Sequence, residues 1–278
     1  PLAWSALLAF LAPRAIPGVE AVDLERGVYR RTVELAGAPG VIEVWNEPAE
    51  HALRVRAHLP DFAGLVHLVA GIRRLFDLDA EPRIIDRALA RDPALRALVR
   101  AQPGMRVPGA IDPFELGVRA ILGQQVSVGA ATRLAGRLVE QFGQPVPGVS
   151  ALGLTHLFPE PDDLAGADLT TIGVTQARAR AIGAFADALA CGKLRLDAGR
   201  SLDERLHELR SLPGFGDWTA QYVAMRACGE RDAFPASDLG LRRALDGLDA
   251  AALEQRAERW RPWRAYAALH LWTGGTSV

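Results

Sequence analysis

A short glycine-rich segment has residue types that could bind a phosphate group. Residues 212–220 read Leu-Pro-Gly-Phe-Gly-Asp-Trp-Thr-Ala. Glycine permits positive φ angles and leaves the neighbouring amides open to a ligand, because it has no side chain. Amides at the start of a following helix lack helical partners and also suit an anion. A Pro-Gly-x-Gly string alone is typical of an ordinary turn, but the full string predicts a phosphate-binding hairpin made of Gly214, Phe215, Gly216, Asp217 and Thr219.

A single carboxylate, Asp238, follows this segment at the start of another expected helix. It ends the string Phe-Pro-x-x-Asp at 234–238, and Leu239 comes next. An aspartate at such a position accepts hydrogen bonds from the first helical amides and is favoured by the helix dipole. A role as helix cap is sufficient to explain Asp238, and the same position would also hold a carboxylate in place for chemistry.

Helices are needed to position these residues. Leu202, Leu206 and Leu209 lie on one face of an expected helix over 201–211, which ends before Pro213. A second apolar helix, containing Tyr222, follows the glycine turn. The expected arrangement is therefore helix, tight hairpin, helix.

Another helix start lies at residues 112–115, which read Asp-Pro-Phe-Glu and combine a capping residue, a first-turn proline and an acid. The residues expected to point inward from this helix are Phe114, Val118, Ile121 and Leu122. Gly123, Gln124 and Gln125 then interrupt the apolar pattern, and Ser127 can cap the next helix. By pattern alone, the two glutamines are typical of a solvated corner between helices.

Strand signals are confined to the first part of the chain. Apolar residues alternate with polar ones along 53–59, and 29–35 and 41–45 are further strand candidates. One expected helical face then contains Phe62, Leu65, Val66, Val69, Ile72 and Phe76. We therefore predict an α+β N-terminal domain with a small antiparallel sheet, followed by an all-α helix-hairpin-helix bundle, so that the chain is mostly α overall.

Composition argues against several classes of protein. The formal net charge is −1, which neither favours nor excludes nucleic-acid binding. Two cysteines, Cys191 and Cys228, are too few for a disulfide framework or a four-cysteine iron–sulfur cluster, and no His-x-x-x-His spacing indicates a metal. No apolar stretch approaches the roughly 20 residues of a membrane span. Residues 1–16 lack a basic leader, so we expect a cytoplasmic protein.

Long strings of the sequence resemble the helix-hairpin-helix base-excision glycosylase superfamily, and within it the bacterial 3-methyladenine DNA glycosylase II group. The resemblance covers nearly the whole chain. The strings that carry it are Trp4-Ser5, Ala12 to Arg14, Arg-Arg-Leu-Phe-Asp-Leu at 73–78, Gly-Val-Arg-Ala-Ile-Leu-Gly-Gln-Gln-Val-Ser at 117–127, the hairpin, Phe-Pro-x-x-Asp at 234–238 and the aromatic-rich stretch 257–272.

The resemblance implies three domains. The first is the α+β domain over 1–88. The second is a helical domain over 113–230 with the hairpin at 202–228. The third is a helical domain that completes the cleft and consists of 89–112 together with 231–278.

The resemblance also implies that the chain excises alkylated bases of the 3-methyladenine and 7-methylguanine type from duplex DNA, with Asp238 facing the scissile glycosidic bond. Breaking that bond develops positive charge on the sugar, and a fixed anion in a dry cleft stabilises this charge better than water does. Asp238 either assists a water molecule or shields the cation directly, and the sequence leaves both roles open.

A base that is flipped out of the helix needs a pocket. Trp218, Tyr222 and Trp272 match pocket aromatics of the family, although as isolated residues they would be typical of a core. Alkylation at a ring nitrogen makes a base cationic, and electron-rich rings attract such a cation by about 1 to 2 kcal/mol when it is desolvated. The residue that fills the gap left by the base aligns with Gln125. Some relatives carry leucine there, so the identity of the wedge stays open.

The same resemblance implies the ligands. No cofactor is expected to be required. The family hairpin binds a monovalent cation, Na+ or K+, through main-chain carbonyls that by position belong to Arg210, Leu212 and Phe215. The expected partner is double-stranded DNA containing alkylated bases, on which the chain acts as a monomer at the nucleoid.

Two other functions are alternatives. A bifunctional glycosylase/lyase resembling endonuclease III needs a lysine beside the hairpin, because its lyase step requires an amine nucleophile. This chain has Trp218 at that position, and its only lysine, Lys193, lies in a polar turn where we expect it to be exposed. A non-catalytic helix-hairpin-helix module needs neither Asp238 nor the aromatic set. The sequence therefore favours a monofunctional enzyme.

Overall fold

The computed structural model describes residues 1–196 and 199–274. Its contacts divide the chain into two compact units. Unit 1 comprises Pro1–Ala6, Gly71–Leu116 and Arg195–Val278, and unit 2 comprises Leu7–Ala70 and Gly117–Leu194. Unit 1 contains both the hairpin and the chain that follows it. The three-domain division expected from the sequence assigns these to different domains, and it stays a prediction.

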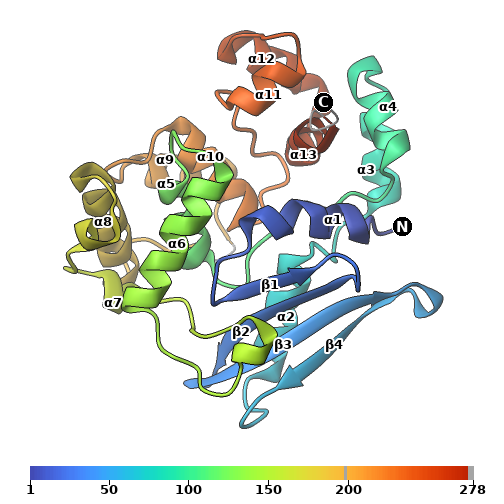
Figure 1. Cartoon of the computed structure of the whole chain (residues 1–278). Helices are drawn as coiled ribbons and strands as arrows, with labels where there is room; N and C mark the ends of the chain where they lie inside the picture. The colour runs from blue at the N-terminus through green and yellow to red at the C-terminus, as the bar shows by residue number, and fades with distance from the viewer. Residues whose placement is uncertain (197–198, 275–278) are drawn as a thin grey trace. The chain divides into compact units, whose positions relative to one another are not determined.

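Unit 2 contains a four-stranded antiparallel sheet whose strands lie side by side in chain order (Figure 1). The strands are β1 (Glu20–Asp23), β2 (Val28–Leu35), β3 (Ala38–Glu47) and β4 (Ala52–His58). Strands β2 and β3 are joined by a two-residue turn in which Ala36 and Gly37 both have positive φ, as the twist of a tight hairpin requires. The three strands expected from the sequence are confirmed, and β1 was missed because it is only four residues long.

One expected apolar face in this region is wrong, and another is wrong at a single residue. Val55 on β4 is 42% exposed, although the alternation of residue types indicated a buried face there. In α2 (Leu65–Leu75), Ile72 is buried and so is Phe76 just beyond it, but four residues expected on the same face are exposed: Phe62, Leu65, Val66 and Val69. Periodicity identifies the apolar side of an element, but only the tertiary structure decides whether another element covers it.

A buried carboxylate, Glu20, joins β1 to β2 and to α5 (Pro113–Leu122) within unit 2. It accepts hydrogen bonds from the Ile16 amide (3.1 Å) and the Tyr29 hydroxyl (2.5 Å). Its carboxylate also pairs with Arg119 Nη1 at 2.9 Å and with Arg31 Nη1 at 3.9 Å. Burial alone would raise the pKa of Glu20, but the two guanidinium groups and these hydrogen bonds together hold it below its usual value.

The helix starts and ends agree with the expected signals. Asp112 accepts hydrogen bonds from the first amides of α5, and Ser127 accepts one from Ala130 at the start of α6 (Val128–Phe142). The four residues of α5 that were expected to point inward are all buried. The other helices and turns of unit 2 are η1 (Ala12–Arg14), η2 (Pro48–Glu50), η3 (Ser150–Leu152), α7 (Pro161–Leu164), η4 (Leu169–Ile172) and α8 (Gln176–Ala190).

The described residues of unit 1 form helices joined by loops, without a strand, and α1 (Trp4–Leu11), α2 and α5 contain the boundaries between the units. Its remaining helices are α3 (Pro82–Leu89), α4 (Pro93–Ala101), α9 (Leu202–Arg210), α10 (Asp217–Arg226), α11 (Leu239–Ala244), α12 (Ala250–Ala257), η5 (Glu258–Trp260) and α13 (Arg264–Gly274). Trp260 and Tyr266 are among its largest fully buried side chains. Within residues 1–196 and 199–274, no helix is both long enough and apolar enough to cross a bilayer.

Candidate active site

Asp238 lies at the N-cap of α11 in unit 1, with its carboxylate held by three N–H donors. Its Oδ1 accepts the Leu241 amide at 3.0 Å, which makes it the helix cap that the sequence indicated. The same oxygen accepts the indole N–H of Trp272 at 2.9 Å, and Oδ2 accepts that of Trp218 at 2.9 Å. The side chain is only half-buried. The carboxylate is therefore fixed in orientation, and its hydrogen-bond donors among the described residues are all neutral.

Three aromatic rings gather beside this carboxylate. Trp218 and Tyr222 lie one turn apart on α10, and their rings stack with centroids 5.1 Å apart and planes 11° from parallel. Tyr222 and Trp272 are tilted, with centroids 6.1 Å apart. All three side chains are half-buried rather than part of the core. The structure thus brings together the four residues that the sequence singled out, and it adds the indole hydrogen bonds, which residue spacing did not reveal.

Arg226 lies behind Tyr222 on the same helix and was not identified from the sequence. Its Nη1 donates to the Tyr222 hydroxyl at 2.6 Å, and its Nε donates to the Pro108 carbonyl. The side chain is 3% exposed. The (i, i+4) spacing of Tyr222 and Arg226 on one helix was the available signal. A buried guanidinium therefore fixes the orientation of Tyr222.

A cavity of about 180 Å³ in unit 1 is lined by Arg226 and by Asp77 and Tyr266, but not by Asp238. The Tyr266 hydroxyl donates to Asp77 at 2.7 Å. Burial raises the pKa of Asp77, and burial next to that carboxyl raises the pKa of Tyr266. This cavity is therefore separate from the Asp238 site, whose three aromatic rings, Trp218, Tyr222 and Trp272, are half-buried.

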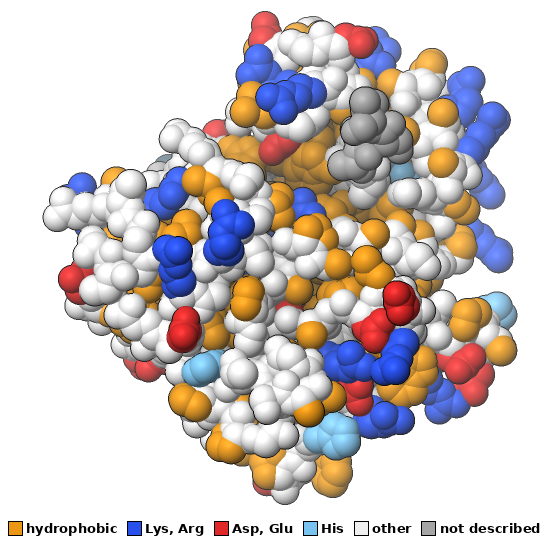
Figure 2. Space-filling model, in the orientation of Figure 1, with side chains coloured by type: hydrophobic (Ala, Val, Ile, Leu, Met, Phe, Trp, Pro, Cys, Tyr) orange, Lys and Arg blue, Asp and Glu red, His pale blue; other side chains and the backbone are white. Residues whose placement is uncertain are grey.

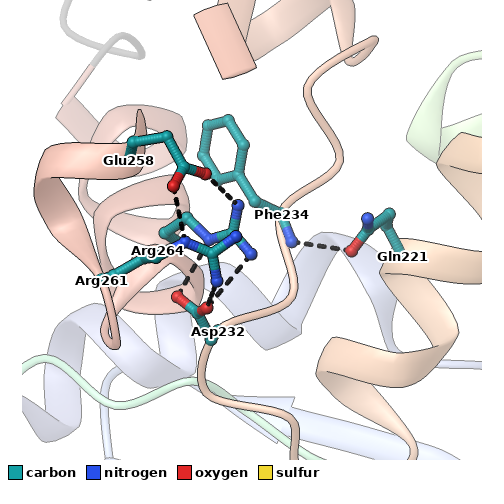
Figure 3. A network of polar contacts seen from close by, with 6 residues as sticks. All are labelled: Gln221, Asp232, Phe234, Glu258, Arg261 and Arg264. Carbon is teal, nitrogen blue, oxygen red and sulfur yellow. Dashed lines mark hydrogen bonds and ion pairs between the residues drawn. The ribbon is translucent and has the colours of Figure 1, made fainter. Parts of the chain in front are cut away.

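The segment that leads to Asp238 is anchored to the start of α13. Arg264 is buried and donates to both oxygens of Asp232, from Nε at 2.9 Å and from Nη2 at 3.1 Å. Figure 3 shows Arg261 converging on the same carboxylate and Glu258 accepting from both arginines. Because α13 also carries Trp272, one helix contacts this segment at both ends.

A second anchor holds the middle of the segment. The Phe234 amide donates to the side-chain carbonyl of Gln221 on α10 at 2.9 Å, in a buried environment (Figure 3). Gln221 is adjacent to Tyr222 in the chain. The backbone between α10 and α11 is therefore held by side chains from both of the helices that carry the aromatic rings.

His270 lies on α13 with its ring fully buried. Neither ring nitrogen has a hydrogen-bond partner among the described residues. Burial lowers its pKa to about 4, because the charged ring would lose its hydration. His270 is therefore a neutral core residue at physiological pH and not a candidate acid or base.

The hairpin has the expected form, helix α9, a tight turn and helix α10. Gly214 has φ of +78°, a conformation that favours glycine. Gly216 has φ of −72°. The expectation that the backbone uses positive φ at both glycines is therefore confirmed for Gly214 and wrong for Gly216. A side chain at Gly216 would meet no other protein atom within 4 Å. Gly216 is the N-cap of α10 and no side chain caps this helix. Open space and uncapped amides therefore occur together at Gly216.

The other hairpin residues differ in exposure. Phe215 and Thr219 are buried, so their side chains do not face a ligand. Asp217 is exposed and forms an ion pair with Arg210. A phosphate oxygen would therefore meet the uncapped amides at the start of α10, beside the exposed Arg210–Asp217 pair.

The loop between α5 and α6, in unit 2, presents Gln125. This residue has φ of +55°, which is uncommon for a residue other than glycine, and its side chain is exposed. Arg178 donates to the carbonyl of the preceding Gln124. Val126 is also 37% exposed, and the sequence did not predict the exposure of this apolar side chain. The loop therefore presents one polar and one apolar side chain at its tip.

The remaining reactive side chains are few. Lys193 is exposed, as expected, in the turn after α8. Cys191 and Cys228 are free thiols. Among residues 1–196 and 199–274, no group of three or more His, Cys, Asp or Glu side chains is arranged to hold a metal ion.

Two family descriptions match the chain. Residues 1–112 match the AlkA N-terminal domain, and residues 118–263 match the HhH-GPD superfamily of base excision DNA repair proteins. The second match contains the hairpin, Asp238, Trp218 and Tyr222. Trp272 lies beyond its end.

Several known proteins are similar over nearly the whole chain. A probable bifunctional transcriptional activator/DNA repair enzyme AlkA of Mycobacterium tuberculosis is 46% identical over 98% of this chain and 55% of its own length, so the chain spans about half of that relative. DNA-3-methyladenine glycosylase 2 of Escherichia coli is 37% identical over 98% of this chain and 94% of its own.

Among solved structures, a 3-methyladenine DNA-glycosylase from Archaeoglobus fulgidus has the same fold. Its TM-score is 0.85 with 24% identity, and the match covers 99% of this chain and 96% of that one. Fold, motif and sequence comparison agree, and the chain belongs to the HhH-GPD superfamily of base excision DNA repair glycosylases, with an AlkA-type N-terminal domain.

Proposed function

We propose that this chain is a monofunctional DNA glycosylase that hydrolyses the N-glycosidic bond of alkylated bases in duplex DNA, with Asp238 as its essential carboxylate. The observation that carries the proposal is that the Asp238 carboxylate accepts two indole N–H groups and lies beside the stacked rings of Trp218 and Tyr222. An anion in this position stabilises the positive charge that develops on the sugar when the base leaves. The aromatic faces suit a flipped base, particularly a cationic one.

Chromatography of released bases tests the activity directly. Duplex DNA methylated at adenine and guanine is incubated with the enzyme, and we expect free 3-methyladenine and 7-methylguanine in the soluble fraction. The DNA itself should stay intact until heat and alkali cleave the abasic sites. A chain that binds this DNA but releases no base would instead be a non-catalytic hairpin module.

The monofunctional part of the proposal has its own test. A lyase step needs an amine close to the sugar and partly unprotonated, and arginine cannot serve because its pKa lies above about 12. The only lysine, Lys193, is exposed. Borohydride added during turnover should trap no protein–DNA adduct above the level given by Lys193→Ala. A strong adduct that depends on Lys193 would refute the claim.

The proposed selection of damaged bases rests on the rings of Trp218, Tyr222 and Trp272. Tyr222→Ala and Trp272→Ala should slow the excision of cationic alkylated bases more than that of neutral ones, if attraction between the cation and the rings contributes. Equal losses on both substrates would mean that the rings act only by packing or stacking.

We propose that the hairpin binds the DNA backbone through the amides around Gly214, Gly216 and Asp217. Gly216→Ala is the sharper variant, because its φ suits alanine and no protein atom opposes the new methyl group. It should weaken the binding of damaged and undamaged DNA alike, since phosphate contacts carry no base information. Unchanged affinity together with lost excision would contradict this role.

We also propose Gln125 as the residue that enters the gap left by the flipped base. Its positive φ and exposed side chain at the loop tip support the assignment, and Val126 is the neighbouring alternative. Gln125→Ala should reduce excision from duplex DNA more than from a mismatched site, where the base is already unstacked. A larger effect of Val126→Ala would transfer the role to Val126.

We propose that the hairpin binds a monovalent cation, Na+ or K+. The carbonyls of Arg210, Leu212 and Phe215 would hold it, and Leu212 O already accepts the Phe215 amide, although a carbonyl oxygen has a second lone pair. Excision should then respond to exchange of Na+ or K+ for a bulky organic cation at constant ionic strength. We propose that the enzyme acts as a monomer on chromosomal DNA in the bacterial cytoplasm.

A further inference from the structure

Helices α3 and α4 and the turn between them carry five exposed arginines, which we call the arginine surface: Arg83 and Arg87 on α3, Arg91 in the turn, and Arg96 and Arg100 on α4. Two pairs are four residues apart on one helix and therefore lie on the same helix face, about 6 Å apart along its axis. Figure 2 shows basic side chains along the edge that α3 and α4 occupy in Figure 1. The two helices thus share a strongly cationic outer side.

The acids of this region are engaged elsewhere. Asp86 and Asp92 are the only carboxylates between residues 82 and 101, and Glu81 directly before α3 is exposed and forms no ion pair with these arginines. Asp86 accepts the Gly104 amide at 2.9 Å, and Asp92 is buried and accepts the indole N–H of Trp260 at 3.0 Å. The two negative charges therefore do not neutralise the outer side.

The arginines also lack acidic partners. Among the described residues, none of Arg83, Arg87, Arg91 and Arg100 forms an ion pair with a carboxylate. Arg96 is different, because its guanidinium donates to the Ala90 and Arg91 carbonyls across the turn between the helices. Four guanidinium groups are thus available to an external anion.

The arginine surface does not face the helix that carries the active-site tryptophan. Helix α4 approaches α13 through Leu98, which lies against Gly274. Arg96 and Arg100 are two residues away from Leu98 on either side, which is about 200° around the helix. Arg96 and Arg100 therefore point away from α13, the helix that carries Trp272 beside Asp238.

The chemistry of the surface fits a phosphate backbone. Ile84 is the one large apolar side chain exposed among residues 82–101, which the structure describes in full. A protein partner would need an apolar or aromatic core at its interface, whereas a DNA backbone is bound by arginine and lysine charge alone. The evenly spaced cations without an apolar centre favour DNA.

We propose that the arginine surface binds a second segment of duplex DNA while a first segment lies at Asp238. The inference rests on the proposed function only in taking DNA as the ligand at Asp238. A second contact lets the enzyme pass directly from one segment to another, because the new duplex is engaged before the old one is released. This would speed the search for rare damaged bases in a large excess of undamaged DNA.

The rate of dissociation tests this proposal. The enzyme is bound to a labelled duplex that contains an uncleavable abasic-site analogue, and unlabelled undamaged duplex is added at rising concentration. We expect the observed dissociation rate of the wild type to rise several-fold with competitor. The combined variant Arg83→Gln, Arg87→Gln, Arg91→Gln and Arg100→Gln should dissociate at a rate that does not depend on competitor.

A control variant matches the change in charge. It replaces four exposed arginines elsewhere with glutamine, namely Arg26, Arg54, Arg56 and Arg259, and it should keep the competitor dependence of the wild type. A wild-type rate that is independent of competitor would overturn the proposal, and this is also the result expected if the surface serves an acidic protein. The proposal would also be overturned if the dissociation rate of the combined variant Arg83→Gln, Arg87→Gln, Arg91→Gln and Arg100→Gln rose with competitor as it does in the wild type.

Base release in a single turnover is measured on the same three proteins. It should be equal in all of them at saturating enzyme, because none of the substituted residues contacts Asp238 or the three aromatic rings beside it. A wild type that releases no base would refute the proposed function, whereas the dissociation rates would still decide the role of the arginine surface.

Discussion

Two carboxylates in this chain are held in opposite ways. Glu20 in unit 2 is fully buried and faces two guanidinium groups, with a tyrosine hydroxyl and an amide as further donors. Asp238 in unit 1 is half-buried, and its hydrogen-bond donors in the described part of the chain are two indoles and an amide. Both are fixed in orientation, but only Glu20 has its charge cancelled by cations.

The difference indicates which carboxylate can do chemistry. A negative charge that is already paired with arginine has little attraction left for a new cation, and removing one member of such a buried pair mainly costs stability. Neutral donors hold a carboxylate without neutralising it, so its field remains available to a positively charged sugar. Glu20 is therefore a structural acid and Asp238 is the candidate catalytic one.

The largest expected effect is on excision in Asp238→Asn. Asparagine is also a good helix cap, so the fold and the affinity for damaged DNA should be retained. Removing the charge should lower the single-turnover excision rate by roughly a thousand-fold, as for the loss of a strong electrostatic contribution. Quenched-flow or manual sampling of base release measures this rate. Near-normal turnover would remove the distinction between the two carboxylates.

Glu20→Gln should give the opposite pattern. The free energy of unfolding should fall by about 3 kcal/mol at neutral pH, because Arg119 and Arg31 lose their counter-charge in the interior. Urea unfolding measures this loss. Excision per folded molecule should change little, and a specific loss of excision without a loss of stability would contradict the structural role.

The pH dependence sharpens this test. The pKa of Glu20 is lowered in the folded state, so its stabilising contribution is fully present above the ordinary value of 4.5 and disappears as the pH falls toward the folded value. Unfolding curves of the wild type and Glu20→Gln should therefore converge as the pH falls below 4.5. A constant difference across this range would mean that the charge of Glu20 is not the cause.

Arg264→Gln tests whether Asp238 depends on how its segment is anchored. Loss of the two hydrogen bonds to Asp232 should displace the segment and reduce the single-turnover rate roughly ten-fold, because small misplacement of a reacting group is costly. The affinity for DNA with an abasic-site analogue should be unchanged, and in the Asp238→Asn background the substitution should cause no further loss. An equal loss in both backgrounds would show that Arg264 does not act through Asp238.

Arg261→Gln is the matched control for Arg264→Gln. Arg261 contacts the same Asp232, but its side chain is 48% exposed to water. Exposed ion pairs contribute little, so we expect a change in rate of less than about two-fold.

A smaller effect than that of Arg264→Gln is expected from Trp272→Phe, which removes one indole donor and keeps an aromatic ring. A single hydrogen bond contributes about 1 kcal/mol, so the rate should fall about five-fold while Trp218 and the Leu241 amide still hold Asp238. Trp263 lies directly before α13, and Trp263→Phe should have no effect on the rate. A loss as large as that of Asp238→Asn would mean that orientation by Trp272, rather than charge alone, governs the reaction.

The sequence by itself determined the local elements and the residue set. The hairpin, the cap at Asp238 and the helix starting at Asp112 were all predictable, because capping residues, glycine turns and apolar spacing act over a few neighbouring residues. The long resemblance to base-excision glycosylases also selected Trp218, Tyr222 and Trp272, which spacing alone would have assigned to a core.

Only the tertiary structure decided which groups meet. The indole hydrogen bonds to Asp238, the Arg264–Asp232 pair and the buried pairing of Glu20 with Arg119 join residues that are 20 to 99 positions apart in the chain. The apolar face over residues 62–76 is the converse case, since its pattern indicated burial but four of its six apolar residues are exposed. Periodicity and capping report the preferences of a segment. The partner of a side chain depends on how separate segments pack, and no local signal encodes that.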